Sequence, residues 1–207
     1  MFFKLVRPLI TIFLWLFYPF KVRGKENVIH DGNTVIICNH LGKLDVPMIG
    51  YIFKGKTYYL AKKEWFNKKW RIWLFDKMGG IPIDRDKPSL DTMRTVKKLL
   101  ADGKRLCVFP EGTRNKKSTE IQPLHGGAGV FAFKAGSKIL PLNIHKRSKI
   151  WRRNSIYVGK AFDFSEFEGQ KLDSALNEKL TQKMYEELCK AKAEHEALID
   201  AKRNKKK

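Results

Sequence analysis

The chain of 207 residues has few cysteines, no linker and no serine nucleophile motif. Its three cysteines, Cys38, Cys107 and Cys189, are too few and too far apart for a disulfide framework, so we expect reduced thiols in a cytoplasmic compartment. No Gly- or Ser-rich linker and no internal repeat occurs, which favours one domain. No Gly-x-Ser-x-Gly motif occurs, so a covalent acyl-enzyme has no obvious serine to carry it.

A metal centre and a thiol nucleophile are also not expected. The five histidines, at positions 30, 40, 125, 145 and 195, are scattered without the spacing of metal ligands. Cys38 lies next to Asn39 and His40 and could be read as a nucleophile. It closes an apolar strand, however, and free cysteine packs well in cores, so core packing is the favoured interpretation.

Acidic residues are scarce as well. There are 21 Asp+Glu against 42 Lys+Arg, and the formal net charge is +21 at pH 7. Because like charges oppose a compact state, this excess indicates an anionic partner: nucleic acid, an anionic membrane or a phosphorylated substrate. The chain is still 43% hydrophobic and 12% aromatic, which excludes disorder for most of it. Its length allows a proper core.

The main apolar stretch near the N-terminus is Leu9 to Phe20, with cations on both sides. As a helix it would span about 18 Å, short of the ~30 Å hydrocarbon core. No small-residue cleavage site follows, so we expect it to be retained rather than removed as a signal peptide. With Trp15 and Tyr18 near one end it suits shallow insertion into one leaflet, which indicates a peripheral or monotopic protein on the cytoplasmic face of the cell membrane. A buried core helix is the alternative.

A second stretch, Glu64 to Met78, combines aromatic residues at helical spacing with intervening cations. This composition suits the headgroup layer of a membrane, with core packing and base stacking in nucleic acid as alternatives. Soluble nucleic-acid binders lack an apolar segment such as residues 9–20. We therefore favour an anionic membrane leaflet as the partner and expect no nucleic acid.

Short β-rich runs alternate with helical patterns, which predicts one α/β domain with a central, mostly parallel sheet flanked by helices. The expected strands are 34–38, 57–60, 80–83, 105–109, 138–144 and 155–158, and the expected helices are 46–53, 64–78, 90–102, 129–136 and the segment from 174 onward. Ser89 is the expected N-cap of the third helix. Pro141 predicts an edge strand or a distorted strand. The basic end, residues 202–207, is expected to be disordered.

A polar cluster follows the first predicted strand and contains Asn39, His40 and Asp45. Ligands of open α/β sheets bind outside the carboxyl ends of the strands, where this cluster lies. Across a turn eased by Gly42, Asp45 can reach back and accept the Nδ1 proton of His40. Nε2 is then left as a base for a substrate hydroxyl. A structural histidine satisfied by the core is the alternative.

A second cluster, Phe109 to Arg114, follows another buried strand and suits an anion. A loop with the Gly112 backbone, the Thr113 hydroxyl and the forked Arg114 guanidinium can hold a phosphate. Glu111 fits such a site only if it pairs with an arginine or accepts a bond from a substrate hydroxyl. Arg85, after the strand 80–83, can converge on the same phosphate. Charged surface turns are the alternative for both segments.

Four blocks occur in order: N-H-x4-D at 39–45, G-x-x-x-D-R at 80–85, F-P-E-G-T-R at 109–114 and an apolar segment with proline at 139–144. Over about residues 20–160 this order resembles the glycerolipid acyltransferases, most closely the 1-acyl-sn-glycerol-3-phosphate acyltransferases of the bacterial type. The resemblance implies that His40 is the general base on the sn-2 hydroxyl of lysophosphatidate and Asp45 its orienting partner. It further implies phosphate binding by Arg85, Glu111, Gly112, Thr113 and Arg114, and an acyl-donor region around Pro141.

The implied reaction is direct transfer of an acyl group from acyl-CoA or acyl carrier protein, giving phosphatidic acid without a metal, a cofactor or an acyl-enzyme. Glycerol 3-phosphate or another lysophospholipid is the alternative acceptor, and a non-enzymatic basic protein that binds membrane or nucleic acid is the alternative of another class. Many members carry serine where this chain has Gly42. The expected division is an apolar membrane-associated segment (1–22), a catalytic domain (23–190) and a basic helical or disordered tail (191–207).

Overall fold

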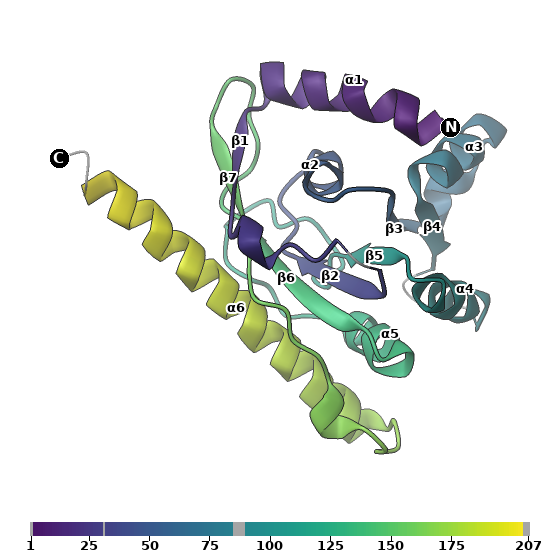
Figure 1. Ribbon diagram of the computed structural model, residues 1–207. Helices are drawn as coiled ribbons and strands as arrows, with labels where there is room; N and C mark the ends of the chain where they lie inside the picture. Colours follow the sequence, from purple (N-terminus) through teal and green to yellow (C-terminus); the bar gives the residue numbers. More distant parts are fainter. Residues whose placement is uncertain (1, 31, 85–89, 205–207) are drawn as a thin grey trace.

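The computed structural model describes residues 2–30, 32–84 and 90–204, which form a seven-stranded sheet between two layers of helices (Figure 1). The strand order is β1-β7-β6-β2-β5-β3-β4. The strands are β1 Phe20–Arg23, β2 Thr34–Cys38, β3 Thr57–Lys62, β4 Gly80–Ile83, β5 Arg105–Val108, β6 Lys138–Ile144 and β7 Asn154–Val158. The five strands β2 to β6 pair in parallel, whereas β7 runs antiparallel to β6 and β1 runs parallel to β7. The predicted α/β domain with a mostly parallel sheet is confirmed.

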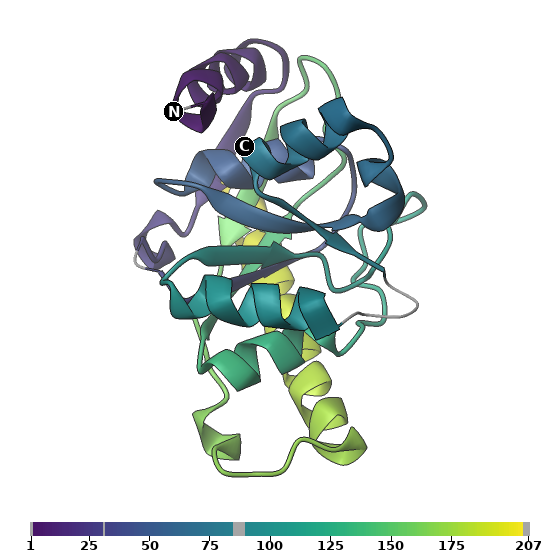
Figure 2. The same ribbon diagram turned by 90° about the vertical axis from the view of Figure 1, so that its right-hand side faces the viewer.

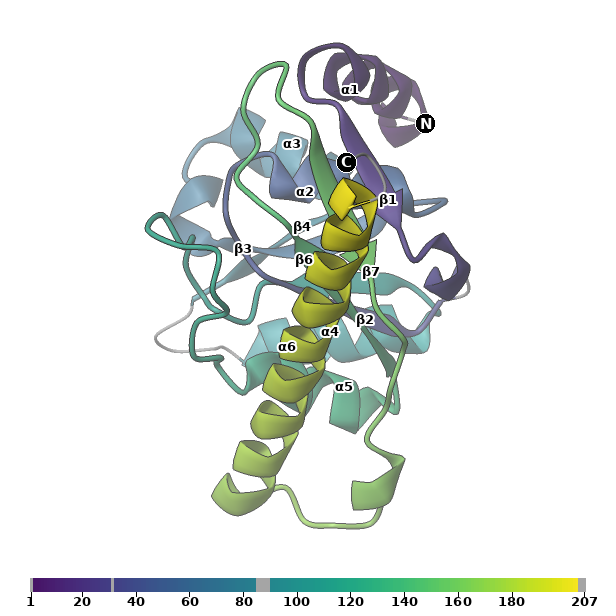
Figure 3. The ribbon, with the colours of Figure 1, turned by 90° about the vertical axis from the view of Figure 1, so that its left-hand side faces the viewer.

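Six α-helices are described: α1 Phe2–Phe17, α2 Asp45–Ile52, α3 Lys69–Met78, α4 Leu90–Ala101, α5 Gly127–Ala135 and α6 Ser174–Asn204. The single helix expected over 64–78 is instead a 3₁₀ turn, Lys63–Phe66, followed by α3. Ser89, the expected cap of α4, lies outside the described residues. Figure 2 shows α1 and α2 above the sheet and α4 and α5 below it, while Figure 3 shows α6 crossing the sheet.

Both faces of the central strand β2 are covered. Val35 and Ile37 pack with α4, α5 and α6 in one core cluster, and Ile36 and Cys38 pack with α1 and α2 in another. A strand buried on both faces reads as a continuous apolar run, which is why residues 34–38 could be recognised in the sequence. Burial raises the pKa of the Cys38 thiol well above its usual range, consistent with the core interpretation of this residue.

Pro141 lies in β6, inside the sheet, so its expected place on an edge strand is wrong. The strand pairs with β2 on one side, where Ile37 is opposite Pro141, and with β7 on the other. The antiparallel ladder covers Leu142 to Ile144 and resumes only at a bridge between Ile139 and Phe162. The missing N–H of Pro141 falls at this break in the ladder.

The N-terminal helix is mostly uncovered. Leu14 is buried, but the exposed large side chains of α1 include Leu5, Leu9, Ile12, Phe13, Trp15 and Leu16. In α3, Trp70 and Trp73 are also exposed by more than half. Core packing, the alternative for both segments, is therefore wrong for these side chains. Among the described residues, no helix combines the length and apolar content needed to cross a bilayer.

The C-terminal segment is one long helix. α6 continues to Asn204, so disorder is wrong for residues 202–204, while residues 205–207 lie outside the described part of the chain. Ala191 and His195 are buried in this helix, so the first turns of the segment expected as a basic helical or disordered tail pack against the domain. Burial lowers the pKa of His195 to about 4, and Ser155 and Asn143 hydrogen-bond its two ring nitrogens at 2.8 Å.

Candidate active site

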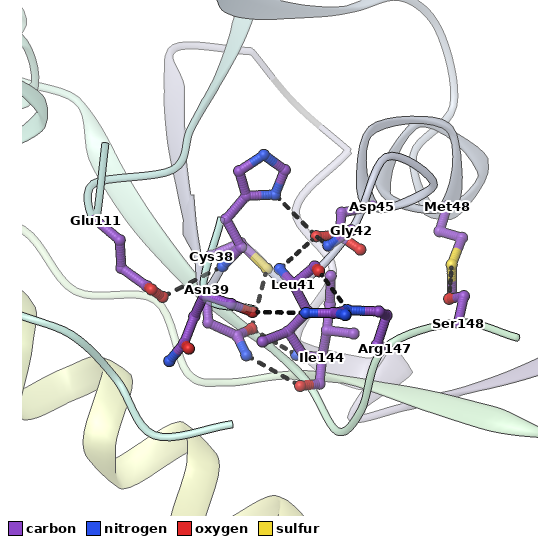
Figure 4. Close-up of polar contacts among 12 residues, drawn as sticks. Cys38, Asn39, Leu41, Gly42, Asp45, Met48, Glu111, Ile144, Arg147 and Ser148 are labelled. Carbon is purple, nitrogen blue, oxygen red and sulfur yellow. Dashed lines mark hydrogen bonds and ion pairs between the residues drawn. The ribbon is translucent and has the colours of Figure 1, made fainter. Parts of the chain in front are cut away.

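His40 and Asp45 are brought together where β2 ends and α2 begins. Nδ1 of His40 lies 2.8 Å from Oδ2 of Asp45. The same Oδ2 accepts the backbone N–H groups of Leu41 at 2.7 Å and Gly42 at 2.8 Å, as Figure 4 shows. Asp45 is fully buried, whereas 16% of the His40 side chain is accessible. A carboxylate held by three donors keeps the proton on Nδ1, which leaves the Nε2 lone pair available to a substrate.

The imidazole is also held by its neighbours. Its ring stacks on Phe109, with the ring centroids 4.1 Å apart and the planes 22° from parallel. Phe109 directly follows β5, whose neighbour in the sheet is β2. The carboxyl ends of two adjacent parallel strands therefore bring the two predicted clusters to one edge of the sheet.

Glu111 contacts the loop that carries His40. Its side chain is 3% exposed, and Oε1 accepts the backbone N–H of His40 at 3.2 Å. Burial, assisted by the charge of Asp45 and opposed by the His40 hydrogen bond, raises the pKa of Glu111 from 4.5 to about 7. Among the described residues the partner of this carboxyl is the His40 backbone, and not an arginine, which was one of the two partners that the sequence suggested; the other, a substrate hydroxyl, stays a prediction.

The loop after Glu111 contains three further residues of the expected anion site. Gly112 has a φ of 69°, and a Cβ built on it would lie 2.7 Å from the His125 ring, so this turn needs glycine. Thr113 is exposed and Arg114 is half-buried on the same loop. Arg85 lies outside the described residues. Pro141 is buried inside the sheet, where it packs against Gly159.

Three residues that sequence reasoning missed or left unassigned join the loops at this edge. Asn39 exchanges two hydrogen bonds with the backbone of Ile144, at 2.8 and 3.0 Å. Asn115 donates its backbone N–H to the His40 carbonyl at 2.7 Å. Arg147 donates to the carbonyls of Leu41 at 3.1 Å and Asn115 at 3.2 Å. Asn39 could have been predicted to have a structural role because it is a polar residue directly after an apolar strand, whereas nothing in the sequence pattern indicated a role for Arg147.

A histidine and a buried carboxylate at the carboxyl edge of an α/β sheet form a site that can activate a hydroxyl group. The family model described as Acyltransferase matches residues 19–145, which include His40, Asp45, Glu111 and Pro141. The chain belongs to the acyltransferase family. It is therefore an enzyme, as the sequence predicted, and the alternative of a non-enzymatic basic protein is wrong.

Individual relatives agree with this assignment. The 1-acyl-sn-glycerol-3-phosphate acyltransferase of Bacillus subtilis is 31% identical over 179 residues, which cover 80% of this chain and 86% of the relative. The protein of the same name from Borreliella burgdorferi is 26% identical over 197 residues, covering 88% and 78%. The crystal structure of the LPA acyltransferase PlsC from Thermotoga maritima has the same fold, with a TM-score of 0.68 at 22% identity over 92% of this chain and 79% of that one.

Proposed function

We propose that this enzyme transfers a fatty acyl group from an acyl thioester to the sn-2 hydroxyl of 1-acyl-sn-glycerol 3-phosphate and so forms phosphatidic acid. The observation that carries the proposal is the 2.8 Å contact between His40 Nδ1 and Asp45 Oδ2, because it leaves Nε2 as the proton acceptor. The activity named for the Bacillus and Borreliella relatives supports this choice of acceptor.

In the proposed reaction, Nε2 of His40 removes the proton of the sn-2 hydroxyl as its oxygen attacks the thioester carbonyl carbon. The C–S bond then breaks, and the leaving thiolate takes the proton from the imidazolium. Asp45 stabilises the transient imidazolium charge and keeps the ring in one tautomer. A positioned base of this kind contributes about 10²–10⁴-fold, so donors to the developing oxyanion supply much of the remaining acceleration.

We assign the acceptor's phosphate to the loop that holds Gly112, Thr113 and Arg114, with Arg85 as a further ligand. Glu111 supports the same site from within, because its carboxyl accepts the His40 N–H. Pro141 is assigned to the acyl-donor region by family resemblance alone. Acyl-CoA and acyl carrier protein are both acidic donors that suit the basic surface, and direct transfer from either needs no metal or further cofactor.

We place the enzyme on the cytoplasmic face of the cell membrane, as a peripheral or monotopic protein on an anionic leaflet. The exposed apolar side chains of α1, with Trp15 76% exposed, support this location. So does α3, which contacts the start of α1 through the Phe2 and Trp73 rings, 4.8 Å apart between centroids. Lysophosphatidate is itself an anionic membrane lipid, so an enzyme at the surface meets its acceptor there.

The test is a mass-spectrometric assay of purified protein with lysophosphatidate and either acyl-CoA or acyl carrier protein loaded with the same chain. We expect phosphatidic acid from the wild type and at least about 10²-fold less from His40→Ala, with the variant still folded at the assay temperature. Full activity of His40→Ala refutes the mechanism. Glycerol 3-phosphate and other lysophospholipids, supplied together with lysophosphatidate, compete directly, and a preferred acylation of any of them refutes the proposed acceptor.

A further inference from the structure

All five tryptophans of this chain are exposed, by 48% to 76%. Tryptophan is mostly buried in water-soluble domains, and its amphipathic ring is enriched where proteins meet the headgroup layer. Four of the five, Trp15, Trp65, Trp70 and Trp73, lie in the two segments already assigned to the membrane. The fifth, Trp151, is 74% exposed and lies far from them in the sequence.

Trp151 lies at the tip of the β6–β7 loop, residues 145–153. Lys149 and Arg152 form an isolated antiparallel bridge that places Ile150 and Trp151 in a tight turn. Ile150 is 55% exposed, and Trp151 has a φ of 55°, a conformation that bulky residues rarely adopt. Two exposed apolar side chains are thus presented at the end of a turn that is costly to form.

The loop lies directly beside α1. The backbone N–H of Trp151 donates to the carbonyl of Phe17 at 2.7 Å, and that of Asn154 donates to Pro19 at 3.0 Å. Figures 1 and 3 both show the green segment between β6 and β7 rising next to α1. Because α3 contacts the opposite end of α1 through Phe2 and Trp73, the three elements form one continuous row.

The β6–β7 loop is strongly basic. It contains Lys146, Arg147, Lys149, Arg152 and Arg153 and no acidic residue. Within the described part of the chain, none of these five cations forms an ion pair. Burial, together with the charge of Arg152, lowers the pKa of Lys146, which reflects the crowding of positive charge here. Anions at the tip would relieve this repulsion.

We propose that the tip of the β6–β7 loop is a separate contact with an anionic leaflet, in which Ile150 and Trp151 enter the headgroup boundary while Lys149, Arg152 and Arg153 bind lipid phosphates. The inference rests on the proposed membrane location of α1, since the two elements touch. Exposed apolar side chains beside unpaired cations match the chemistry of that surface. The base of the loop also reaches the active site, because Arg147 holds the carbonyls of Leu41 and Asn115.

The test is co-sedimentation of the full chain with two kinds of vesicle, phosphatidylcholine alone and an equal mixture of phosphatidylcholine and phosphatidylglycerol. Each basic residue at an anionic surface contributes about fivefold in affinity. The double variant Arg152→Gln/Arg153→Gln is therefore expected to bind the mixed vesicles roughly 30-fold more weakly than the wild type. Its binding to vesicles of phosphatidylcholine alone should be unchanged. The matched control is Lys97→Gln/Lys98→Gln, the same loss of charge on α4 across the sheet. Its expected effect is under about twofold because of screening.

A second variant tests the apolar part. Trp151→Asn removes the indole while suiting the positive φ, and it is expected to weaken binding to both kinds of vesicle about tenfold. Leu90→Ser, at a site 73% exposed on α4, is its control and is expected to change nothing. Equal melting temperatures establish that the variants are folded.

The outcomes separate this inference from the proposed function. If the wild type binds mixed vesicles and the loop variants bind equally well, or if the α4 controls lose as much, the loop contact is refuted while α1 and the reaction stand. If the wild type binds no vesicle, the membrane location fails together with the loop contact. If Arg152→Gln/Arg153→Gln weakens only the binding of a short DNA duplex, the partner is nucleic acid and the proposal is overturned.

Discussion

Replacing Gly42 with serine is expected to stabilise the protein, because the site around Asp45 has an unused acceptor. Oδ2 of Asp45 accepts three hydrogen bonds, but Oδ1 is buried and has no partner among the described residues. A Cβ built on Gly42 lies 3.6 Å from this Oδ1 and 3.7 Å from the nearest carbon of Arg147, so a side chain fits without strain. A hydroxyl one bond further out can reach the ~2.7 Å of an O–H···O bond.

The expected magnitude has two parts. Any residue in place of glycine at a compatible backbone position stabilises by about 0.4–1 kcal/mol through the unfolded state, and Gly42→Ala measures this part. The hydroxyl of Gly42→Ser adds a hydrogen bond to a buried charge, which is about 1–2 kcal/mol after the hydroxyl is ordered. For a chain of this length, that addition raises the melting temperature by about 2–8 °C above the alanine variant.

The assay is urea unfolding and calorimetry of the wild type, Gly42→Ala and Gly42→Ser, with acyl transfer measured in parallel. The serine variant should be the most stable and should keep its activity, since the contact between His40 and Asp45 is unchanged. Equal stability of the serine and alanine variants would show that Oδ1 already has a partner and would refute this account of the Asp45 carboxylate.

Two further predictions concern the loop after β5. The pKa of Glu111 is about 7 in the folded state and 4.5 otherwise, so the unfolded state releases its proton first and the free energy of unfolding falls as pH rises from about 4.5 to 7. Urea titrations at pH 5 to 8 should show this dependence on pH in the wild type and its loss in Glu111→Gln. The same dependence in both proteins contradicts the prediction. Gly112→Ala should destabilise by about 1–2 kcal/mol and raise the KM for the acceptor, because its Cβ meets the His125 ring. Gly55→Ala, with a φ of 82° and open space around it, should show a similar stability loss and an unchanged KM.

The sequence alone determined the class of fold and the centre of the site. Strands buried on both faces appear as apolar runs, and for this reason the predicted strands 34–38 and 138–144 have the same bounds as β2 and β6. The pairing of His40 with Asp45 could also be predicted from the sequence, because the two residues are five positions apart and need only one turn between them to meet. Neither inference needed a contact between distant segments.

Only the tertiary structure decided what surrounds that centre. β1 was not expected, and it forms by pairing with β7, more than 130 residues further along the chain. Glu111 was expected to pair with an arginine or with a substrate hydroxyl, and the structure shows that it accepts the backbone N–H of His40, 71 residues away. The Arg147 side chain hydrogen-bonds to the carbonyls of Leu41 and Asn115, which are 106 and 32 residues away in the sequence. Trp151 hydrogen-bonds to Phe17 of α1, which is also far from it in the sequence. Contacts between residues so far apart leave no periodicity in the sequence, because they depend on how the strands are ordered in the sheet and not on the neighbours along the chain.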